Sequence, residues 1–265
     1  MKIKYIKYAA EILYNSRMNM ERLERLPTNC IPLNKKDAYL IQENLVYKYL
    51  SSNGNISEIG KKVGCTNKAA QNQINVNEPF YGSLLSRYSK KSNNSLKIKN
   101  FFKPFIEPEF SFKIEKNIPI KNAPYSSEKI YKYIKTVLPS IEIVDSRFND
   151  WTKVGINNLI ADNGVNSFWI HGKETDKINE YNFLNHNVKV YINNKIVKQG
   201  NSKNVLSNPI NSITWLVNNL AKQKKYLIKN SYISTGTCTP AIPVKKGDKV
   251  IADFGKLGKI RVNFI

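Results

Sequence analysis

The sequence predicts an α+β protein in which a small α-rich N-terminal lobe precedes a larger β-rich domain. In the first 50 residues, apolar side chains recur at helical spacing. From residue 159 onward, most segments alternate apolar and polar residues, as strands with one buried face do. Between these regions, residues 89–100 form a polar, charged stretch that suits a boundary. We therefore expect a lobe over residues 1–88 and a β-rich catalytic domain over residues 89–265.

The composition indicates a globular protein without a membrane span. Of the 265 residues, 41% are hydrophobic, and no apolar run reaches the roughly 18 residues that a transmembrane helix needs. Glu11 interrupts the N-terminal segment before a signal-peptide core can form, so we expect a cytoplasmic protein. Three scattered cysteines and two histidines favour neither a disulfide framework nor a thiolate or histidine-rich zinc site. Oxygen ligands are therefore the expected metal chemistry.

The formal net charge of +22 raises the question of a nucleic-acid partner. The lysines are spread over every segment, however, and do not gather into one stripe with stacking aromatic residues. We therefore expect no nucleic-acid partner. The positive charge should instead attract anionic small molecules.

The N-terminal lobe is expected to contain two helices. The first begins near the N-terminus, and Pro27 and Pro32 break the chain after it. The second covers residues 37–50, where apolar residues fall on one face, and either Asn34 or Asp37 can cap it.

A strand-like piece follows at residues 59–66, and it contains Gly60 and Gly64. Glycines at these points let a backbone or a ligand approach closely. The two lysines between them are either ordinary surface lysines or, for one of them, a placed functional group. Residues 78–82 read as a turn that follows this strand.

The middle of the chain is expected to form one helix and one strand. The helix runs over residues 126–135 after a serine cap, and Pro139 ends it. The strand covers residues 141–147. Asp145 and Arg147 share one face of that strand and are close enough for an ion pair.

The C-terminal part predicts mostly strands, with a hairpin, a helix and two closing strands. The hairpin covers residues 187–200 and turns at an Asn-Asn pair. The helix begins with a cap at Asn208 and a proline at its first position, and it has a buried stripe of Ile210, Ile213, Leu216 and Leu220. A turn at residues 246–248 and a glycine-containing bend then accompany the closing strands.

Two carboxylates within residues 105–112 are the main candidate for chemistry. Glu107 and Glu109 lie two residues apart, so in an extended chain they project to one side while the apolar residues face the other. Two neighbouring ionised carboxylates repel each other, which indicates a metal site or an acid/base dyad unless the face is simply solvated. Glu142 lies in an apolar strand in the same way and could converge on the same cavity.

Ordered motifs along nearly the whole chain give it a family resemblance. The motifs are DAYLIQ (37–42), GKKVGCT (60–66), EPFYG (78–82), IEPEFSF (106–112), IEIVDSRFNDW (141–151), ADN (161–163), SNPINSITWLVNNLA (207–221) and PVKKGDKVIADFGKLG (243–258). Taken together, they resemble the 2-keto-4-pentenoate hydratase and 4-oxalocrotonate decarboxylase family of the fumarylacetoacetate hydrolase superfamily.

The resemblance implies a small N-terminal lobe followed by a mixed β-sandwich roll of the fumarylacetoacetate hydrolase type. It further implies that Glu107, Glu109 and Glu142 hold Mg²⁺ or Mn²⁺, and three carboxylates suit such a hard cation. A homo-oligomer is also implied.

The same resemblance places the catalytic lysine at Lys62 and substrate-binding positions at Val63 and Gly64. The implied substrate is a 2-oxo or 2-hydroxydienoic acid, whose developing enolate charge a bound metal would stabilise while Lys62 moves protons.

The implied activity is addition of water to a 2-hydroxypenta-2,4-dienoate-type substrate, which gives a 4-hydroxy-2-oxo acid in meta-cleavage degradation of aromatic compounds. Phe80 departs from the acidic residue usual in the hydratases and resembles the decarboxylase branch. Residues 164–166 replace a serine-rich stretch. A 4-oxalocrotonate-type decarboxylase is therefore the alternative, and a catalytically degenerate, basic binding protein is a third hypothesis.

Overall fold

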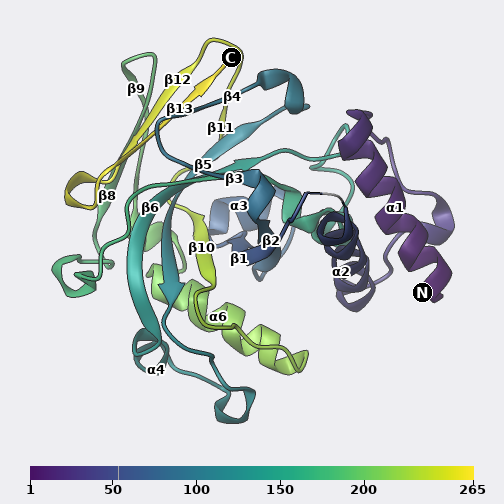
Figure 1. Cartoon of the computed structure of the whole chain (residues 1–265), viewed down its shortest axis with the longest axis horizontal. Helices are drawn as coiled ribbons and strands as arrows, with labels where there is room; N and C mark the ends of the chain where they lie inside the picture. Colours follow the sequence, from purple (N-terminus) through teal and green to yellow (C-terminus); the bar gives the residue numbers. More distant parts are fainter. Residues whose placement is uncertain (53) are drawn as a thin grey trace.

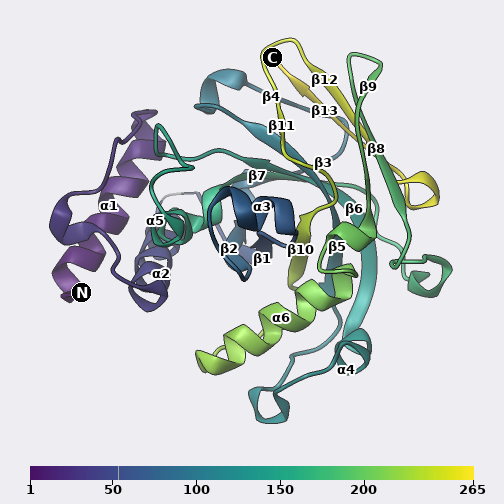
Figure 2. The same ribbon diagram turned by 180° about the vertical axis from the view of Figure 1, so that it is seen from behind.

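The computed structural model describes residues 1–52 and 54–265 and contains helices and two curled sheets (Figures 1 and 2). In this part of the chain the helices are α1 (Ile3–Asn19), α2 (Lys35–Ser51), α3 (Lys68–Gln73), α4 (Ser127–Tyr131), α5 (Ile156–Ala161) and α6 (Pro209–Lys222). The strands are β1 (Glu58–Gly64), β2 (Phe80–Leu85), β3 (Ser89–Lys91), β4 (Asn94–Leu96), β5 (Phe105–Ile114), β6 (Ile134–Val144), β7 (Asn166–His171), β8 (Asn187–Ile192), β9 (Lys195–Asn201), β10 (Tyr232–Thr237), β11 (Ile242–Pro243), β12 (Lys249–Asp253) and β13 (Lys259–Phe264). The predicted α+β class is confirmed.

The larger sheet has the order β2-β1-β10-β5-β6-β7-β3, and β11 pairs with β5 outside this path. The sheet curls so strongly that β2 at one end contacts β7 near the other end. Leu84, Leu138 and Trp169, from β2, β6 and β7, form a small buried cluster inside the curl. The sheet therefore has a closed inner face and a convex outer face.

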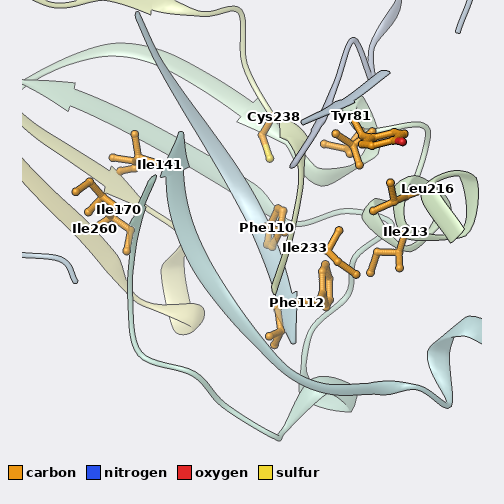
Figure 3. Packing of buried hydrophobic residues seen from close by; sticks show 14 of the residues in the cluster. Tyr81, Phe110, Phe112, Ile141, Ile170, Ile213, Leu216, Ile233, Cys238 and Ile260 are labelled. Atoms are coloured by element: carbon orange, nitrogen blue, oxygen red, sulfur yellow. The ribbon is translucent and has the colours of Figure 1, made fainter. Parts of the chain in front are cut away.

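The convex face carries the main hydrophobic core (Figure 3). Phe110 and Phe112 project from β5 into a cluster that also contains Ile213 and Leu216 of α6. The second sheet, of order β4-β13-β12-β8-β9, contributes residues such as Ile260 to the same cluster. Because side chains alternate along a strand, the polar residues between these apolar ones on β5 and β6 face inward.

The N-terminal helices lie against the larger sheet on the side away from the five-stranded sheet (Figures 1 and 2). α1 and α2 contact each other and share a second core, which reaches Leu85 and Phe148. Asn34 caps α2, since its side-chain oxygen accepts a hydrogen bond from the Asp37 N–H (3.0 Å). β1 and β2 nevertheless belong to the larger sheet, and the division after residue 88 stays a prediction. No helix in the described ranges combines the length and the apolar character that crossing a membrane requires.

The predicted helix over residues 126–135 is wrong beyond its first turns. α4 ends at Tyr131, and β6 begins at Ile134 and continues through Pro139. The Pro139 carbonyl accepts a hydrogen bond from the Gly172 N–H (2.9 Å). The N and C=O of one residue in an antiparallel strand point to the same side, so the Pro139 nitrogen also faces the end of β7. The missing N–H of proline therefore leaves the hydrogen bonds between β6 and β5 intact. The β-branched residues of this segment therefore favour a strand over a continuation of the helix.

Three other assignments also change. The predicted turn at 78–82 already belongs to β2 from Phe80 onward. The predicted polar loop at 89–100 contains β3 and β4, which pair with β7 and β13 in parallel. The predicted strand character from residue 159 begins only at Asn166, because α5 continues to Ala161. The hairpin at 187–200, helix α6 and the closing strands are confirmed.

The expected ion pair between Asp145 and Arg147 is wrong. Arg147 is buried and pairs with Asp162, to which its backbone N–H (3.0 Å), its Nε and its Nη2 (2.7 Å, on the carbonyl) all donate. Asp145 instead accepts the backbone N–H groups of Phe102 (2.8 Å) and Lys103 (2.7 Å).

We expect Asp162→Ala to lower the free energy of unfolding by about 3–5 kcal/mol, because it leaves the Arg147 charge buried without its partner. Urea titration followed by circular dichroism measures the loss. Glu180→Ala, which breaks the exposed pair with Lys177, is the control and should change little. Equal losses from the two changes would show that the buried pair has no special weight.

Candidate functional site

Four strands of the larger sheet bring the candidate residues to its inner face. Glu107 on β5 pairs with Glu142 on β6, and Glu109 is two residues further along β5. Lys62 on β1 pairs with Ser234 on β10, the strand between β1 and β5. Because directly paired residues project to the same face, the register alone places these side chains together.

The three carboxylates predicted from the sequence converge. One oxygen from each of Glu107, Glu109 and Glu142 lies within 4.8 Å of the others. Glu109 and Glu142 are fully buried, whereas Glu107 keeps partial exposure. Their role as metal ligands stays a prediction.

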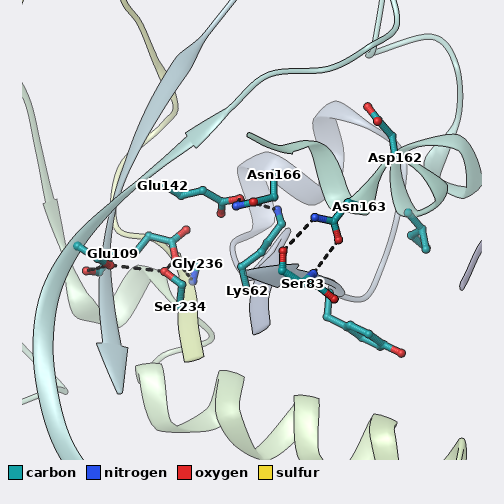
Figure 4. A network of polar contacts seen from close by, with 12 residues as sticks. Lys62, Ser83, Glu109, Glu142, Asp162, Asn163, Asn166, Ser234 and Gly236 are labelled. Carbon is teal, nitrogen blue, oxygen red and sulfur yellow. Dashed lines mark hydrogen bonds and ion pairs between the residues drawn. The ribbon is translucent and has the colours of Figure 1, made fainter. Parts of the chain in front are cut away.

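Each of the two buried carboxylates has one satisfied and one unsatisfied oxygen. Glu109 Oε2 accepts hydrogen bonds from Ser234 Oγ (2.5 Å) and the Gly236 N–H (3.0 Å) (Figure 4). Glu142 Oε1 accepts one from Asn166 Nδ2 (2.8 Å) and lies 3.3 Å from Lys62 Nζ. Glu109 Oε1 and Glu142 Oε2 have no hydrogen-bond partner in the described part of the chain. Buried acceptors left in this way are costly, so the donor set fits a hard divalent cation.

The electrostatics of the cluster point the same way. Burial raises the pKa of Glu107 to about 7, with Glu142 adding to the shift and Lys62 opposing it. Burial and the neighbouring carboxylates also raise the pKa of Glu109 well above its usual range. Burial lowers the pKa of Lys62, but the three carboxylates outweigh burial and the net direction is upward. The cluster thus carries more negative charge than one lysine compensates, and a cation would relieve the excess.

Lys62 and Lys61 project to opposite faces of β1, as the extended segment predicts. Lys62 is buried, and its Nζ lies 5.2 Å from the centre of the Phe80 ring. Lys61 Nζ donates to Ser83 Oγ (3.0 Å) and pairs with Glu58 away from the carboxylates. Of the two lysines, Lys62 is therefore the one that meets the carboxylate cluster.

A cavity of about 760 Å³ opens beside the carboxylates. Lys62, Gly64 and Glu107 line it, whereas the side chain of Val63 is buried in the core on the other face. The substrate-binding roles of Val63 and Gly64 stay predictions. Further lining comes from both apolar and polar side chains, among them Arg22, Cys65, Phe80, Lys103, Phe105, Trp151, Val165, Thr237 and Thr239.

The turn at residues 163–165 is a part of the site that the sequence reasoning missed. All three residues have left-handed backbone angles (φ 52°, 60° and 56°), which is unusual for the β-branched Val165. Asn163 fixes the turn by bonding the Ser83 N–H (2.7 Å) and carbonyl (2.9 Å). A Cβ on Gly164 would lie 2.9 Å from Lys62 Cε, so a side chain at this position would displace the Lys62 stem. The Asp-Asn-Gly sequence is a turn signal, but nothing in it indicates that Asn166 then reaches Glu142.

Residues 56–265 match the model of the family described as fumarylacetoacetate (FAA) hydrolase C-terminal, which is well over half of the chain. The chain belongs to this family. Within it, the chain is 26% identical over 261 residues to a 2-oxo-hept-4-ene-1,7-dioate hydratase of Escherichia coli, covering 97% of this chain and 96% of that protein. It is 25% identical over 256 residues to a 4-oxalocrotonate decarboxylase of Pseudomonas sp. (strain CF600), covering 97% and 95%.

A solved structure of another protein is also similar to this chain. A 4-oxalocrotonate decarboxylase from Pseudomonas putida G7, complexed with magnesium and adipate, superimposes with a TM-score of 0.93 at 24% identity. The match covers 100% of this chain and 99% of that one. The predicted fold type is thereby confirmed.

We expect Glu107→Gln to abolish the rise in melting temperature that Mg²⁺ produces, while the metal-free variant is as stable as the wild type or more so. The folded pKa of about 7 lies above the ordinary 4.5, so the metal-free folded state keeps a proton that the unfolded state gives up. The contribution of this group to stability therefore falls as pH rises from about 4.5 to about 7, and the variant should lack this fall.

Thermal unfolding with chelator or Mg²⁺, at pH 5 and pH 8, measures both effects. Glu180→Gln, which changes an exposed glutamate, is the matched control. Equal stabilisation of wild type and Glu107→Gln by Mg²⁺ would count against Glu107 as a ligand.

Proposed function

We propose that this chain is a divalent-metal-dependent hydratase that adds water to a 2-hydroxypenta-2,4-dienoate-type substrate and forms a 4-hydroxy-2-oxo acid. The observation that carries the proposal is the convergence of three carboxylates, with two unpartnered oxygens, beside one buried lysine at a cavity. Support also comes from the near full-length similarity to a named hydratase. Such a reaction belongs to meta-cleavage degradation of aromatic compounds.

In this proposal Glu107, Glu109 and Glu142 hold Mg²⁺ or Mn²⁺, both of which take oxygen ligands. The bound cation would supply Lewis-acid stabilisation for negative charge on the 2-oxygen of the substrate. Glu107 is the ligand that keeps partial exposure, so it marks the side from which the substrate approaches.

Lys62 is the proposed proton carrier. During ketonisation the 2-hydroxyl of the dienoate loses its proton and C5 gains one, and water then adds hydroxide at C4 and a proton at C3. Lys62 Nζ is buried, lies 3.3 Å from Glu142 Oε1 and faces the same cavity, so it can exchange a proton with the substrate there.

Two cationic side chains of the cavity lining could meet an anionic substrate. Arg22 and Lys103 line the cavity together with Asp145 and Asp150, and no carboxylate of the described residues lies within ion-pair distance of either cation. Together with the net charge of +22, the two cations favour entry of a 2-hydroxydienoate anion. The proposal includes a cytoplasmic homo-oligomer without a nucleic-acid partner, on the strength of the composition and the resemblance. Light scattering after size-exclusion chromatography measures the oligomer.

A 4-oxalocrotonate-type decarboxylase is the second candidate, and Phe80 is the observation that favours it. Its buried ring occupies the wall beside Lys62 and offers no group that could orient water. Decarboxylation needs the same stabilised enolate but no positioned water, so this wall suits it equally.

Ultraviolet absorbance of the dienol distinguishes these functions. With 2-hydroxypenta-2,4-dienoate, we expect loss of absorbance that requires Mg²⁺ and yields the 4-hydroxy-2-oxo acid. Release of CO₂ from a 4-oxalocrotonate-type substrate, without hydration of the first, would assign the decarboxylase instead. No metal-dependent turnover of either substrate would favour the basic binding protein.

We expect Lys62→Met to lower kcat by roughly 10²-fold or more with little change in KM, because the amine acts only as the proton moves. Methionine keeps the apolar stem that packs beside Phe80. Steady-state kinetics with saturating Mg²⁺ measures both constants.

Lys61→Met is the matched control for this change. Lys61 faces away from the carboxylates, so its replacement should be nearly silent. Similar losses from both variants would mean that general positive charge matters more than one placed amine, and the role of Lys62 would have to be withdrawn.

A further inference from the structure

Three serine hydroxyls meet next to Glu109 on the inner face of the larger sheet. Ser111, Ser140 and Ser234 come from the adjacent strands β5, β6 and β10, and all are fully buried. Ser111 Oγ lies 2.7 Å from Ser140 Oγ and 3.0 Å from Ser234 Oγ. Ser234 Oγ is in turn 2.5 Å from Glu109 Oε2 (Figure 4). The cluster thus connects directly to a carboxylate of the candidate metal centre.

The hydrogen bonds of Ser234 have a defined direction when its acceptor is a carboxylate. A carboxylate only accepts, so Ser234 donates its single hydroxyl proton to Glu109 Oε2 and accepts from Ser111 (3.0 Å). Ser140 Oγ can donate its proton either to Ser111 Oγ (2.7 Å) or to the Glu109 carbonyl (3.1 Å), so it holds Ser111 on one side and the Glu109 backbone on the other. The bond from Ser111 polarises the Ser234 hydroxyl that bonds the carboxylate.

The surroundings make this arrangement hard to replace. Leu138 pairs with Ser111 across β5 and β6, and it belongs to the buried apolar cluster with Leu84 and Trp169. Loss of the Ser234 hydroxyl would leave the Gly236 N–H as the remaining donor to Glu109 Oε2. Oε2 would then keep one of its two donors, and the orientation of the Glu109 carboxylate would be held less firmly.

We propose that Ser234, with Ser111 and Ser140 behind it, is a positioning element of the candidate metal centre, which fixes the orientation of the Glu109 carboxylate and presents its Oε1 to the cation. This inference rests on the proposed metal-dependent function and adds to it. Oε2 is occupied by two donors, whereas Oε1 is buried and has no partner in the described part of the chain, so a single oxygen is left for the metal. Ser234 acts through Glu109 and does not touch the substrate.

The test measures metal affinity directly, by titrating metal-free protein with Mn²⁺ and following the electron paramagnetic resonance signal of free Mn²⁺. Ser234→Ala should weaken Mn²⁺ binding about 10- to 100-fold, the range usual for loss of a group that orients a metal ligand. Ser111→Ala should weaken it less, because Ser234 can still donate to Glu109.

Ser212→Ala is the matched control, since Ser212 of α6 is equally buried but its hydroxyl finds no hydrogen-bond partner among the residues that the structure describes. It should leave the Mn²⁺ affinity unchanged. A merely structural role for Ser234 would lower the melting temperature of the metal-free protein without the loss of affinity. If Ser234→Ala does not fold, Ser111→Ala against Ser212→Ala carries the comparison.

The outcomes separate this inference from the proposed function. If the wild type binds no Mn²⁺, the metal-dependent function itself fails. If the wild type binds Mn²⁺ and Ser234→Ala, or Ser111→Ala in its place, binds it equally well, the positioning role is overturned while the proposed function stands.

Discussion

The mutual repulsion of three carboxylates on the inner face of one sheet is the constraint on which the rest of the site depends. Glu107, Glu109 and Glu142 are brought together by the β5–β6 register, and moving that register by one residue would send them into the core. Such a cluster persists in a folded protein only if donors and a counter-charge surround it. Lys62 and Asn166 supply these at Glu142, and β10 supplies two donors at Glu109.

The N-terminal helices help to maintain this arrangement, although they contribute no ligand to it. Arg17 of α1 stacks over the ring of Tyr88 and donates to the backbone carbonyls at the start of β7. One of these carbonyls belongs to Asn166, whose side chain bonds Glu142, and buried Arg147 approaches the same carbonyl (3.4 Å). Helix α1 is thus connected to the carboxylate cluster through Asn166, so packing of α1 and the geometry of Glu142 are coupled.

Strand alternation allowed the central part of the site to be predicted from the sequence, because a period of two fixes which side chains share a face. It placed Glu107 with Glu109 and separated Lys62 from Lys61. Nothing comparable exists for Ser234 or Asn166, whose roles depend on strand neighbours distant in sequence. The helix expected at residues 126–135 failed for a related reason. Branched residues spaced at three and four positions fit a helix face locally, and the pairing with β5 decided in favour of the strand.

The candidate site has two walls that differ in chemistry, one charged and one largely apolar. β5, β6 and β10 form the wall that holds charge, and it would serve any reaction that passes through an enolate. β2 and the turn at residues 163–165 form the other wall, where Phe80 and Gly164 pack against the stem of Lys62. In the proposed reaction, Phe80 on this second wall would bear on whether water reaches the conjugated carbon, whereas the carboxylates of the first wall would hold the cation. Because the two groups come from different strands, a change at residue 80 would alter the proposed reaction far more than the affinity for metal.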